Sequence, residues 1–346
     1  MTSDSSTGAV PSAADATDAS ADRDSAVSTP RGESADERDT AHGRDTAWLD
    51  REAYPFDSHC VGLSAGAVHY VDEGPEDGGR GTLLMLHGNP TWSFLYRHLV
   101  RGLGDEYRCI ALDYLGFGLS ERPPGFSYRP EDHAAVVAEF VAELGLTDLT
   151  LVVQDWGGPI GLSYALDHPE NVRALVVMNT WVWPIDDDRV TRAFSRLLGG
   201  PLGRGLSKRY NVFARYVMPR LYADPSRLTP EIHRHYLEPL SRPEDRRGSW
   251  VFPREILGET EWLASLWDRR GALADYPALL VWGMEDPGFD AGMLRVWQAL
   301  FPDATVHELD GVGHYVQEEM GPDLAPLVRA FLDGLPGDED DVDVAD

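Results

Sequence analysis

The sequence predicts an α/β protein, in which a mostly parallel β-sheet carries helices on both faces. Two observations support this fold class. Short, continuous apolar runs alternate along the chain with segments whose apolar residues recur at helical spacing. Parallel strands covered on both faces have this continuous apolar character, whereas half-exposed strands alternate apolar and polar residues. The length of 346 residues allows one large domain with an insertion, or two domains.

The expected strands follow one another in a regular order. Residues 66–74 follow a Ser-Ala-Gly turn and are typical of one half of an early hairpin. Six later runs are expected to be buried strands: TLLMLH (82–87), CIALD (109–113), LTLVVQ (149–154), ALVVMN (174–179), ALLVWG (278–283) and TVHELD (305–310). Amphipathic helices are expected at SFLYRHLVRGL (93–103), EDHAAVVAEFVAELGL (131–146) and DLAPLVRAFLDGL (323–335).

Changes in composition divide the chain into parts. Residues 1–46 are mostly Ser, Thr, Ala, Asp and Gly, and residues 334–346 are strongly acidic, so we expect both to be disordered tails. The segment 181–270 is rich in Arg, Trp and Pro and has no buried-strand run. We therefore expect a core built from 47–180 and 271–333, with 181–270 as a helical cap over the carboxyl edge of the sheet.

The charge balance is strongly acidic. The chain has 58 acidic and 30 basic residues, a net charge of −28, and Lys208 is its only lysine. Such a surface repels nucleic acid and anionic membranes, so neither is expected as a partner. Abundant Asp with scarce lysine suits a protein kept soluble in a very salty cytoplasm, where salt screens the self-repulsion. This composition predicts a halophilic, archaeal host.

The cysteines and apolar runs bear on the setting of the protein. Cys60 and Cys109 cannot form a disulfide framework, and no paired Cys/His spacing indicates zinc. No signal peptide is recognisable, and no apolar run approaches the roughly 18 residues of a membrane span. We therefore expect a cytoplasmic protein without a metal site.

The stretch LTLVVQDWGGPIGL (149–162) carries the strongest chemical signal. A strand, a sharp turn with a nucleophile and a helix form the nucleophile elbow of α/β hydrolases. Gly157 and Gly158 let the backbone double back and let the helix approach closely. Asp155 stands where a serine or cysteine is usual, and Val153 replaces the first glycine of the generic motif. An alternative is that Asp155 only caps the following helix.

Three other segments fit the same arrangement. The loop HGNPTWSFLYR follows a strand, and the backbone N–H groups of Asn89 and Trp156 would form an oxyanion hole. Asp286 lies just past one late strand, and His314 lies between the last strand and the last helix. The order nucleophile, acid, histidine is that of α/β hydrolases. The Gly-rich loop DYLGFGLSERP (113–123) is interpreted as structural.

At these residues the sequence resembles the haloalkane dehalogenases, over roughly residues 47–333. The motifs HGNPTW, QDWGG, GMEDP and GHYVQEE carry the resemblance as a set. It implies Asp155 as nucleophile, His314 as the base that activates water, and Asp286 as the acid partner of His314. It also implies that Asn89 and Trp156 bind the departing halide.

The resemblance places this sequence in one branch of that family. Some members carry the acid after an earlier strand, where this sequence has only Asn179. Asp286 therefore matches the branch that combines an Asn and Trp halide pair with a late Asp. Members with Glu in place of the Asn use a cap tryptophan instead, and Trp183 and Trp250 are available for a cap contribution.

The residue types fit hydrolysis at saturated carbon. An aspartate is ionised at pH 7 without prior proton loss, so it can displace a leaving group and form an alkyl ester. The resemblance implies a haloalkane substrate, a halide and a primary alcohol as products, and no cofactor or metal. It is also compatible with a homo-oligomer.

Two other functions remain open from the sequence. An epoxide hydrolase would share Asp155 and His314 and would need proton donors, for which the insertion offers Tyr210, Tyr216, Tyr222 and Tyr236. Against it, Asn89 supplies a neutral donor suited to halide. A non-catalytic binding protein of the same fold is disfavoured because such proteins usually lack a triad member. An esterase is disfavoured because the nearest serine, Ser163, lies two helical turns beyond the elbow.

Overall fold

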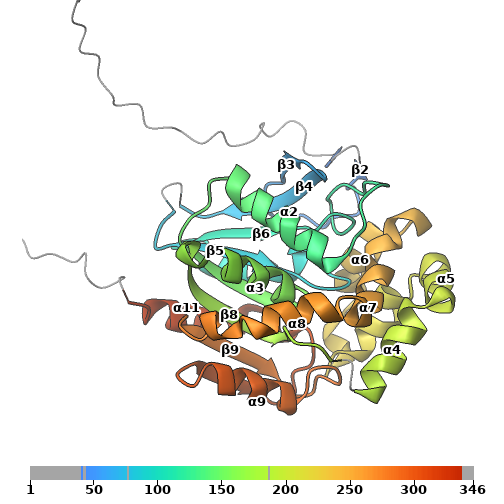
Figure 1. The fold of residues 1–346 in the computed structure, drawn as a ribbon. Helices are drawn as coiled ribbons and strands as arrows, with labels where there is room; N and C mark the ends of the chain where they lie inside the picture. The colour runs from blue at the N-terminus through green and yellow to red at the C-terminus, as the bar shows by residue number, and fades with distance from the viewer. Residues whose placement is uncertain (1–39, 42–43, 76–77, 186–187, 337–346) are drawn as a thin grey trace, which may run out of the picture. The chain divides into compact units, whose positions relative to one another are not determined.

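The computed structural model describes residues 40–41, 44–75, 78–185 and 188–336 (Figure 1). Most of the tails expected to be disordered, 1–39, 42–43 and 337–346, therefore lies outside the described residues. In the described part of the N-terminal segment, β1 (Thr40–Ala41) and β2 (Arg44–Asp45) pair antiparallel with each other.

An eight-stranded sheet forms the core, in the order β10-β9-β8-β7-β5-β6-β4-β3. Its strands are β3 (His59–Leu63), β4 (Gly66–Glu73), β5 (Thr82–Leu86), β6 (Arg108–Leu112), β7 (Leu149–Asp155), β8 (Val172–Thr180), β9 (Ala278–Gly283) and β10 (Thr305–Leu309). The expected hairpin is β3 with β4, and β4 pairs antiparallel with β6. All other neighbours are parallel, so the predicted fold class is confirmed.

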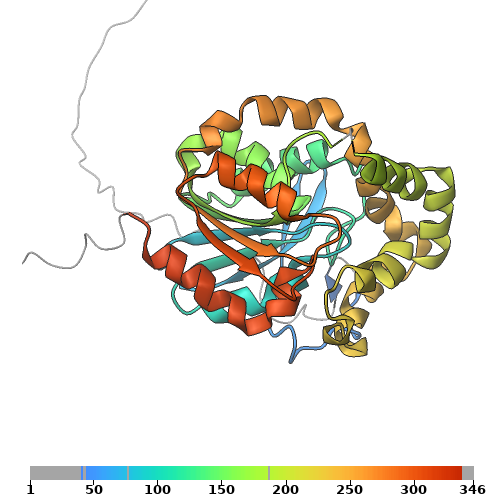
Figure 2. The same cartoon turned by 90° about the horizontal axis from the view of Figure 1, so that it is seen from below.

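Helices cover both faces of this sheet (Figure 2). Those of the core are α1 (Arg97–Leu103), α2 (Pro130–Glu143), α3 (Gly157–Asp167), α8 (Thr260–Asp268), α9 (Ala291–Leu300), α10 (Val316–Met320) and α11 (Leu324–Asp333). Helices α1 and α11 pack on one face, and α2, α3, α8 and α9 on the other. Among the described residues, no helix combines the length and apolar character needed to cross a bilayer.

Strand β7 shows why the sequence forms a doubly covered sheet. All seven of its residues are buried. Successive side chains of a strand point to opposite faces. Leu151 and Val153 accordingly join the apolar cluster beneath α2 and α3, whereas Val152 joins the cluster beneath α1 and α11. A continuous apolar run is therefore required in this strand.

The loop after β6 is held by a buried hydrogen-bonded pair of side chains, Asp113 and His69. Asp113 lies 2.9 Å from Nδ1 of His69, and both side chains are fully buried. The carboxylate also accepts the backbone N–H groups of Ser93 at 2.8 Å and of Leu119 at 2.7 Å. Asp113 thus ties the early hairpin, the loop after β5 and the Gly-rich loop together, which agrees with the structural interpretation of that loop.

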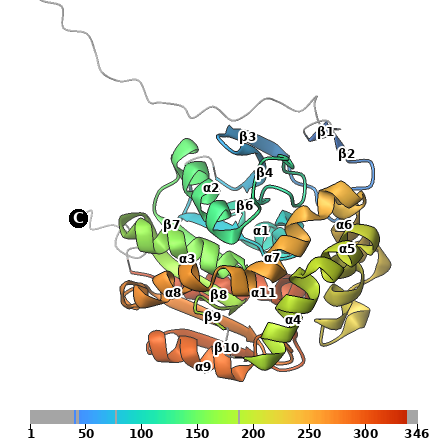
Figure 3. The same cartoon turned by 45° about the vertical axis from the view of Figure 1, so that its right-hand side comes forward.

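The long segment between β8 and β9 folds as helices. It contains α4 (Arg189–Gly199), α5 (Pro201–Tyr210), α6 (Pro230–Leu237), α7 (Arg247–Gly258) and α8. Helices α4 and α5 contact each other, and Figure 1 shows them at the right-hand edge of the fold, away from the strands, whereas Figure 3 brings this side of the molecule forward. Helix α8 packs on α3 instead, so the end of the insertion belongs to the layer that flanks the sheet (Figure 1).

Candidate active site

Asp155 is the last residue of β7 and occupies a strained turn. Its φ of +51° lies in the left-handed region that side chains rarely adopt. A β-carbon on Gly157 would overlap the backbone of Leu86, and one on Gly158 would overlap Thr180. Only glycines therefore let α3 begin directly after the strand. No side-chain hydrogen bond caps α3, so Asp155 does not serve as its cap.

The carboxylate of Asp155 is buried and held by backbone donors. Its Oδ1 accepts the N–H of Asn89 at 2.7 Å, and the N–H of Trp156 also bonds the carboxylate. Burial raises the pKa of Asp155 above its usual value, and His314 and these two N–H groups oppose that rise. Gly88 is needed beside it, because a β-carbon there would overlap this carboxylate.

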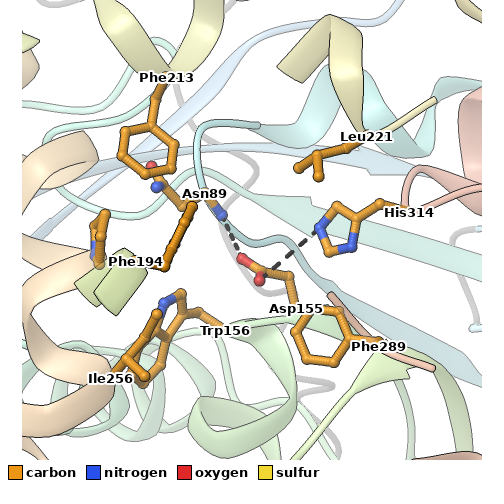
Figure 4. A pocket seen from close by; sticks show the side chains of 10 residues that line it. Asn89, Asp155, Trp156, Phe194, Phe213, Leu221, Ile256, Phe289 and His314 are labelled. Atoms are coloured by element: carbon orange, nitrogen blue, oxygen red, sulfur yellow. Dashed lines mark hydrogen bonds and ion pairs between the residues drawn. The ribbon is translucent and has the colours of Figure 1, made fainter. Parts of the chain in front are cut away.

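His314 lies between the carboxylates of Asp155 and Asp286, and Figure 4 shows its ring directed toward Asp155. Its Nδ1 is 2.8 Å from Oδ2 of Asp286, and its Nε2 is 3.9 Å from Oδ2 of Asp155. Burial disfavours the imidazolium, but the charge and hydrogen bond of Asp286 outweigh burial, so the pKa of His314 is raised. The structure thus brings the three predicted triad residues together, although β7, β9 and β10 supply them from distant parts of the sequence.

Two polar residues that the sequence reasoning did not assign complete this arrangement. Asn179, near the end of β8, donates to Oδ2 of Asp286 at 2.9 Å and accepts the N–H of Gly283 at 2.8 Å. Gln154, one residue before the elbow, has its amide nitrogen 3.0 Å from Nε2 of His314. An N–H donor at that distance keeps Nε2 unprotonated, which is the tautomer a base requires. The sequence offered one signal for each of them: Gln154 directly precedes Asp155, and Asn179 lies near the end of a predicted parallel strand.

A cavity of about 90 Å³ opens beside Asp155. Apart from Asn89, Asp155, Trp156 and His314, its lining is apolar: Phe194, Phe213, Leu221, Pro253, Ile256 and Phe289. The first five of these apolar residues come from the insertion. Phe289 stacks on the ring of His314, at 5.3 Å between centroids. The cavity therefore suits a small, apolar molecule held against one carboxylate.

The side-chain donors lie on one side of the carboxylate. Figure 4 shows Asn89, Trp156 and Phe194 on one side of Asp155 and His314 on the other. The amide nitrogen of Asn89 donates to the carbonyl of Ser249 at a long 3.4 Å. An amide nitrogen carries two hydrogens, so one remains for a bound molecule.

Several residues named from the sequence lie away from this cavity. Neither Trp183 nor Trp250 contributes to the part of the lining that the structure describes. Trp183 packs against Trp267 and Trp297, and Trp250 lies beneath the guanidinium groups of Arg204 and Arg254.

The four candidate tyrosines of the insertion are also elsewhere. Tyr210 and Tyr216 are exposed, and Tyr222 and Tyr236 are buried outside the cavity. The hydroxyl of Tyr236 donates to Glu318. Within the described lining, the cavity therefore contains no phenol that could donate a proton to an alkoxide.

Comparison with known proteins gives concordant results. The sequence profile of the family described as alpha/beta hydrolase fold matches residues 81–320. Haloalkane dehalogenase 2 of Mycobacterium tuberculosis is 41% identical over 82% of this chain and 97% of that protein. A cis-3-alkyl-4-alkyloxetan-2-one decarboxylase of Xanthomonas campestris is 35% identical over 78% of this chain and 93% of that protein.

A solved structure shares the fold. The haloalkane dehalogenase DbeA from Bradyrhizobium elkani superposes with a TM-score of 0.72 at 27% sequence identity, covering 80% of this chain and 98% of that one.

Proposed function

The chain belongs to the haloalkane dehalogenase family of α/β hydrolases, and we propose that it hydrolyses 1-haloalkanes to a primary alcohol, a halide ion and a proton. The observation that carries the proposal is the buried carboxylate of Asp155, fixed at the elbow with His314 on one side and neutral N–H donors on the other. No metal or cofactor enters the reaction as proposed.

In the first step, Oδ2 of Asp155 attacks the carbon that bears the halogen. Oδ1 accepts the Asn89 N–H, whereas Oδ2 is the oxygen on the His314 side, 3.9 Å from Nε2. The new carbon–oxygen bond forms as the carbon–halogen bond breaks, and the electron pair of that bond leaves with the halide. The product on the enzyme is an alkyl ester of Asp155.

The leaving halide needs donors that stabilise developing negative charge. We assign this role to the indole N–H of Trp156 and the side-chain amide of Asn89, which both line the cavity. Both are neutral, so they favour the anion without retaining it as a fixed cation would.

In the second step, His314 takes a proton from water, and the hydroxide attacks the ester carbon of Asp155. Negative charge then develops on Oδ1, which already accepts the N–H of Asn89, and the N–H of Trp156 bonds the same carboxyl group. Asp286 stabilises the imidazolium that forms. Collapse of the intermediate expels the alkoxide, which takes the proton from His314 and leaves as the alcohol, and the carboxylic acid left on Asp155 then releases its proton to solvent and becomes the carboxylate again.

Two related activities are distinguished by the same site. Epoxide opening makes an alkoxide that must be protonated, and the described cavity lining offers no tyrosine for that step. The decarboxylases among the relatives act, by their name, on oxetan-2-ones with two alkyl substituents. The small cavity favours a substrate with a single short chain.

The decisive assay is bromide release from 1-bromobutane by the full chain in KCl solution, with an epoxide and a dialkyl oxetan-2-one run in parallel. We expect bromide in catalytic amounts and little turnover of the other two. Turnover of the oxetan-2-one without bromide release would refute the proposed function.

We also infer an archaeal, high-salt cytoplasm as the setting, although the relatives named above are bacterial. The excess of acidic residues and the single lysine support this inference. Both cysteines, Cys60 and Cys109, are free thiols, which fits a reducing compartment. The unfolding temperature should rise steadily from dilute buffer to molar KCl, and an unchanged or falling temperature would contradict a high-salt setting.

A further inference from the structure

The outer face of the insertion has an unusual distribution of apolar residues. Every large hydrophobic residue that is exposed in the described structure lies between 190 and 216. Six of them form what we call the cap patch, on α4 and α5: Val190, Phe194, Leu197, Leu202, Leu206 and Tyr210. Leu197 and Leu202 are 59% and 65% exposed. Large apolar side chains gathered on one face indicate an interaction surface.

The inward face of the same helices is built from small residues. The buried positions of α4 and α5 are Ser195, Gly199, Gly203 and Ser207. A β-carbon on Gly199 would overlap the backbone of Arg254 on α7. The close packing therefore needs small residues inside, while the apolar side chains of the cap patch are exposed, although Phe194, at 37%, is the least exposed of them and also lines the cavity. A helix that lies between protein and water normally has its large apolar residues toward the protein, so the distribution in α4 and α5 is the reverse of the usual one.

The charge around the cap patch is also the reverse of the rest of the chain. Residues 189–220 contain eight basic residues, Lys208 among them, and no acid, in a protein of net charge −28. All eight are exposed or partly exposed. None of the ion pairs found among the described residues involves them. Three aspartates, 186–188, directly precede this range, and with them the segment 186–220 still carries a net charge of 8 − 3 = +5. The segment that bears the cap patch is therefore positively charged overall.

We propose that the cap patch docks on an anionic lipid surface. A helix with cations beside an exposed apolar face is suited to lie in a membrane interface, where lipid phosphates meet the cations and acyl chains take up the apolar groups. The net charge of −28, taken over the whole surface, predicts that the chain avoids anionic membranes. Docking, however, depends on the local electrostatic field at the surface that makes contact.

Two other occupants fit the cap patch less well. A second copy related by a two-fold axis would place the same cations against each other. The chain's own acidic tail, 337–346, has matching charge but only two valines and one alanine, so it cannot cover six large apolar side chains. A bilayer interface supplies negative charge and apolar volume together. At molar salt the charge contribution shrinks and the apolar contact carries the docking.

Docking would bring the active site to the place where apolar substrates concentrate. Phe194 belongs to the cap patch and also lines the cavity beside Asp155. A haloalkane dissolved in the outer part of a bilayer would then reach the cavity without crossing bulk water. This consequence rests on the proposed function, whereas lipid binding itself does not.

The test is flotation of the full chain with vesicles, at the lowest KCl concentration that preserves its near-ultraviolet circular dichroism. Equimolar phosphatidylglycerol and phosphatidylcholine vesicles are compared with pure phosphatidylcholine. We expect at least about tenfold stronger binding to the anionic vesicles. The double variant R196Q/K208Q should bind those vesicles about 30-fold more weakly, because two surface cations are lost. L197Q/L202Q should bind about 100-fold more weakly.

Matched controls keep the test sharp. None of the four substituted residues lines the cavity, and R295Q removes an exposed cation from α9, outside the insertion, so it should bind as the unmodified chain does. Absence of binding to anionic vesicles, or equal loss in R295Q, would overturn the proposal. So would a dimer in sedimentation that L197Q/L202Q dissociates, because a second copy would then cover the cap patch. Bromide release without vesicles tests the proposed function separately.

Discussion

Replacing Asp286 with asparagine tests how the triad divides its work between the two steps. Oδ2 of Asp286 receives His314 and Asn179, and its Oδ1 receives the N–H of Gly288 at 2.8 Å. In the variant, the asparagine side chain can place its oxygen toward His314. Its NH₂ group then meets one other hydrogen-bond donor, the N–H of Gly288, which it cannot accept. In the opposite orientation, the NH₂ group meets the Asn179 donor instead. It also donates to Nδ1 of His314, which forces the unproductive tautomer of the imidazole. The variant should therefore keep the oxygen toward His314 and preserve the tautomer.

The reduction in the rate of ester hydrolysis should then come mainly from removing the negative charge of Asp286. Removing one partner of a buried ion pair costs about 3–5 kcal/mol, and the retained hydrogen bond places this case near about 3 kcal/mol. Because the imidazolium forms only when water attacks the ester, ester hydrolysis should slow by about 10²-fold. Alkylation of Asp155 does not charge His314, so the rate of halide formation in the first turnover should stay within a few-fold.

Rapid-quench measurement of bromide from 1-bromobutane separates the two rates. The D286N variant should give a burst of about one bromide per enzyme, then slow turnover. His314 must be neutral to act, so activity falls as pH drops through its pKa. That pKa is raised by Asp286 against burial. The acid limb should therefore move to lower pH in the variant. A burst slowed as much as turnover, or an unmoved acid limb, would refute this division of roles.

Three further variants test other parts of the structure. W156F removes the indole N–H and should slow the bromide burst by about 10²–10³-fold, unlike D286N; an unchanged burst would remove Trp156 from halide binding. G88A should lower turnover by at least about tenfold, because its β-carbon overlaps the carboxylate of Asp155, and full activity would show that the loop can move aside. H69L should lower the free energy of unfolding in urea at neutral pH by about 1–3 kcal/mol, because the buried carboxylate of Asp113 loses a hydrogen-bond partner. The pKa of Asp113 is lowered in the fold despite its burial, so this contribution is present above the unfolded pKa and is lost as pH falls through the folded one. The two proteins should therefore converge in acid, and equal stability at neutral pH would contradict the role of the pair.

The sheet and the triad positions could be predicted because both follow from short-range patterns. A strand such as β7 is buried at every residue when both faces of the sheet are covered, so most of its residues are apolar. Asp155 ends one strand of the parallel part of the sheet, and Asp286 and His314 follow two others. The carboxyl ends of parallel strands lie at the same edge of a sheet, so the three residues meet there regardless of the conformation of the connecting loops. Their proximity required no knowledge of side-chain geometry.

The rest of the site depends on packing that these patterns do not determine. Phe194 and Phe213 reach the cavity only through the way α4 and its neighbours pack on α7, and the same helix α4 leaves Val190 and Leu197 exposed. Asn179 contacts Asp286 from a backbone with φ of +28°, which no residue pattern indicates. The insertion's tyrosines, which an epoxide hydrolase would need, and the tryptophans available for a cap contribution lie outside the described cavity lining for the same reason, because a residue type does not determine where its side chain points.

The central claim is that Asp155 forms a covalent ester with the substrate. Its most direct test is the mass of the peptide that contains Asp155 after the H314F variant has reacted with 1-bromobutane. We predict one butyl group on Asp155 and about one bromide released per enzyme, because the ester forms but no base activates water. An unmodified Asp155 peptide, or a butyl group on another residue, would contradict the mechanism.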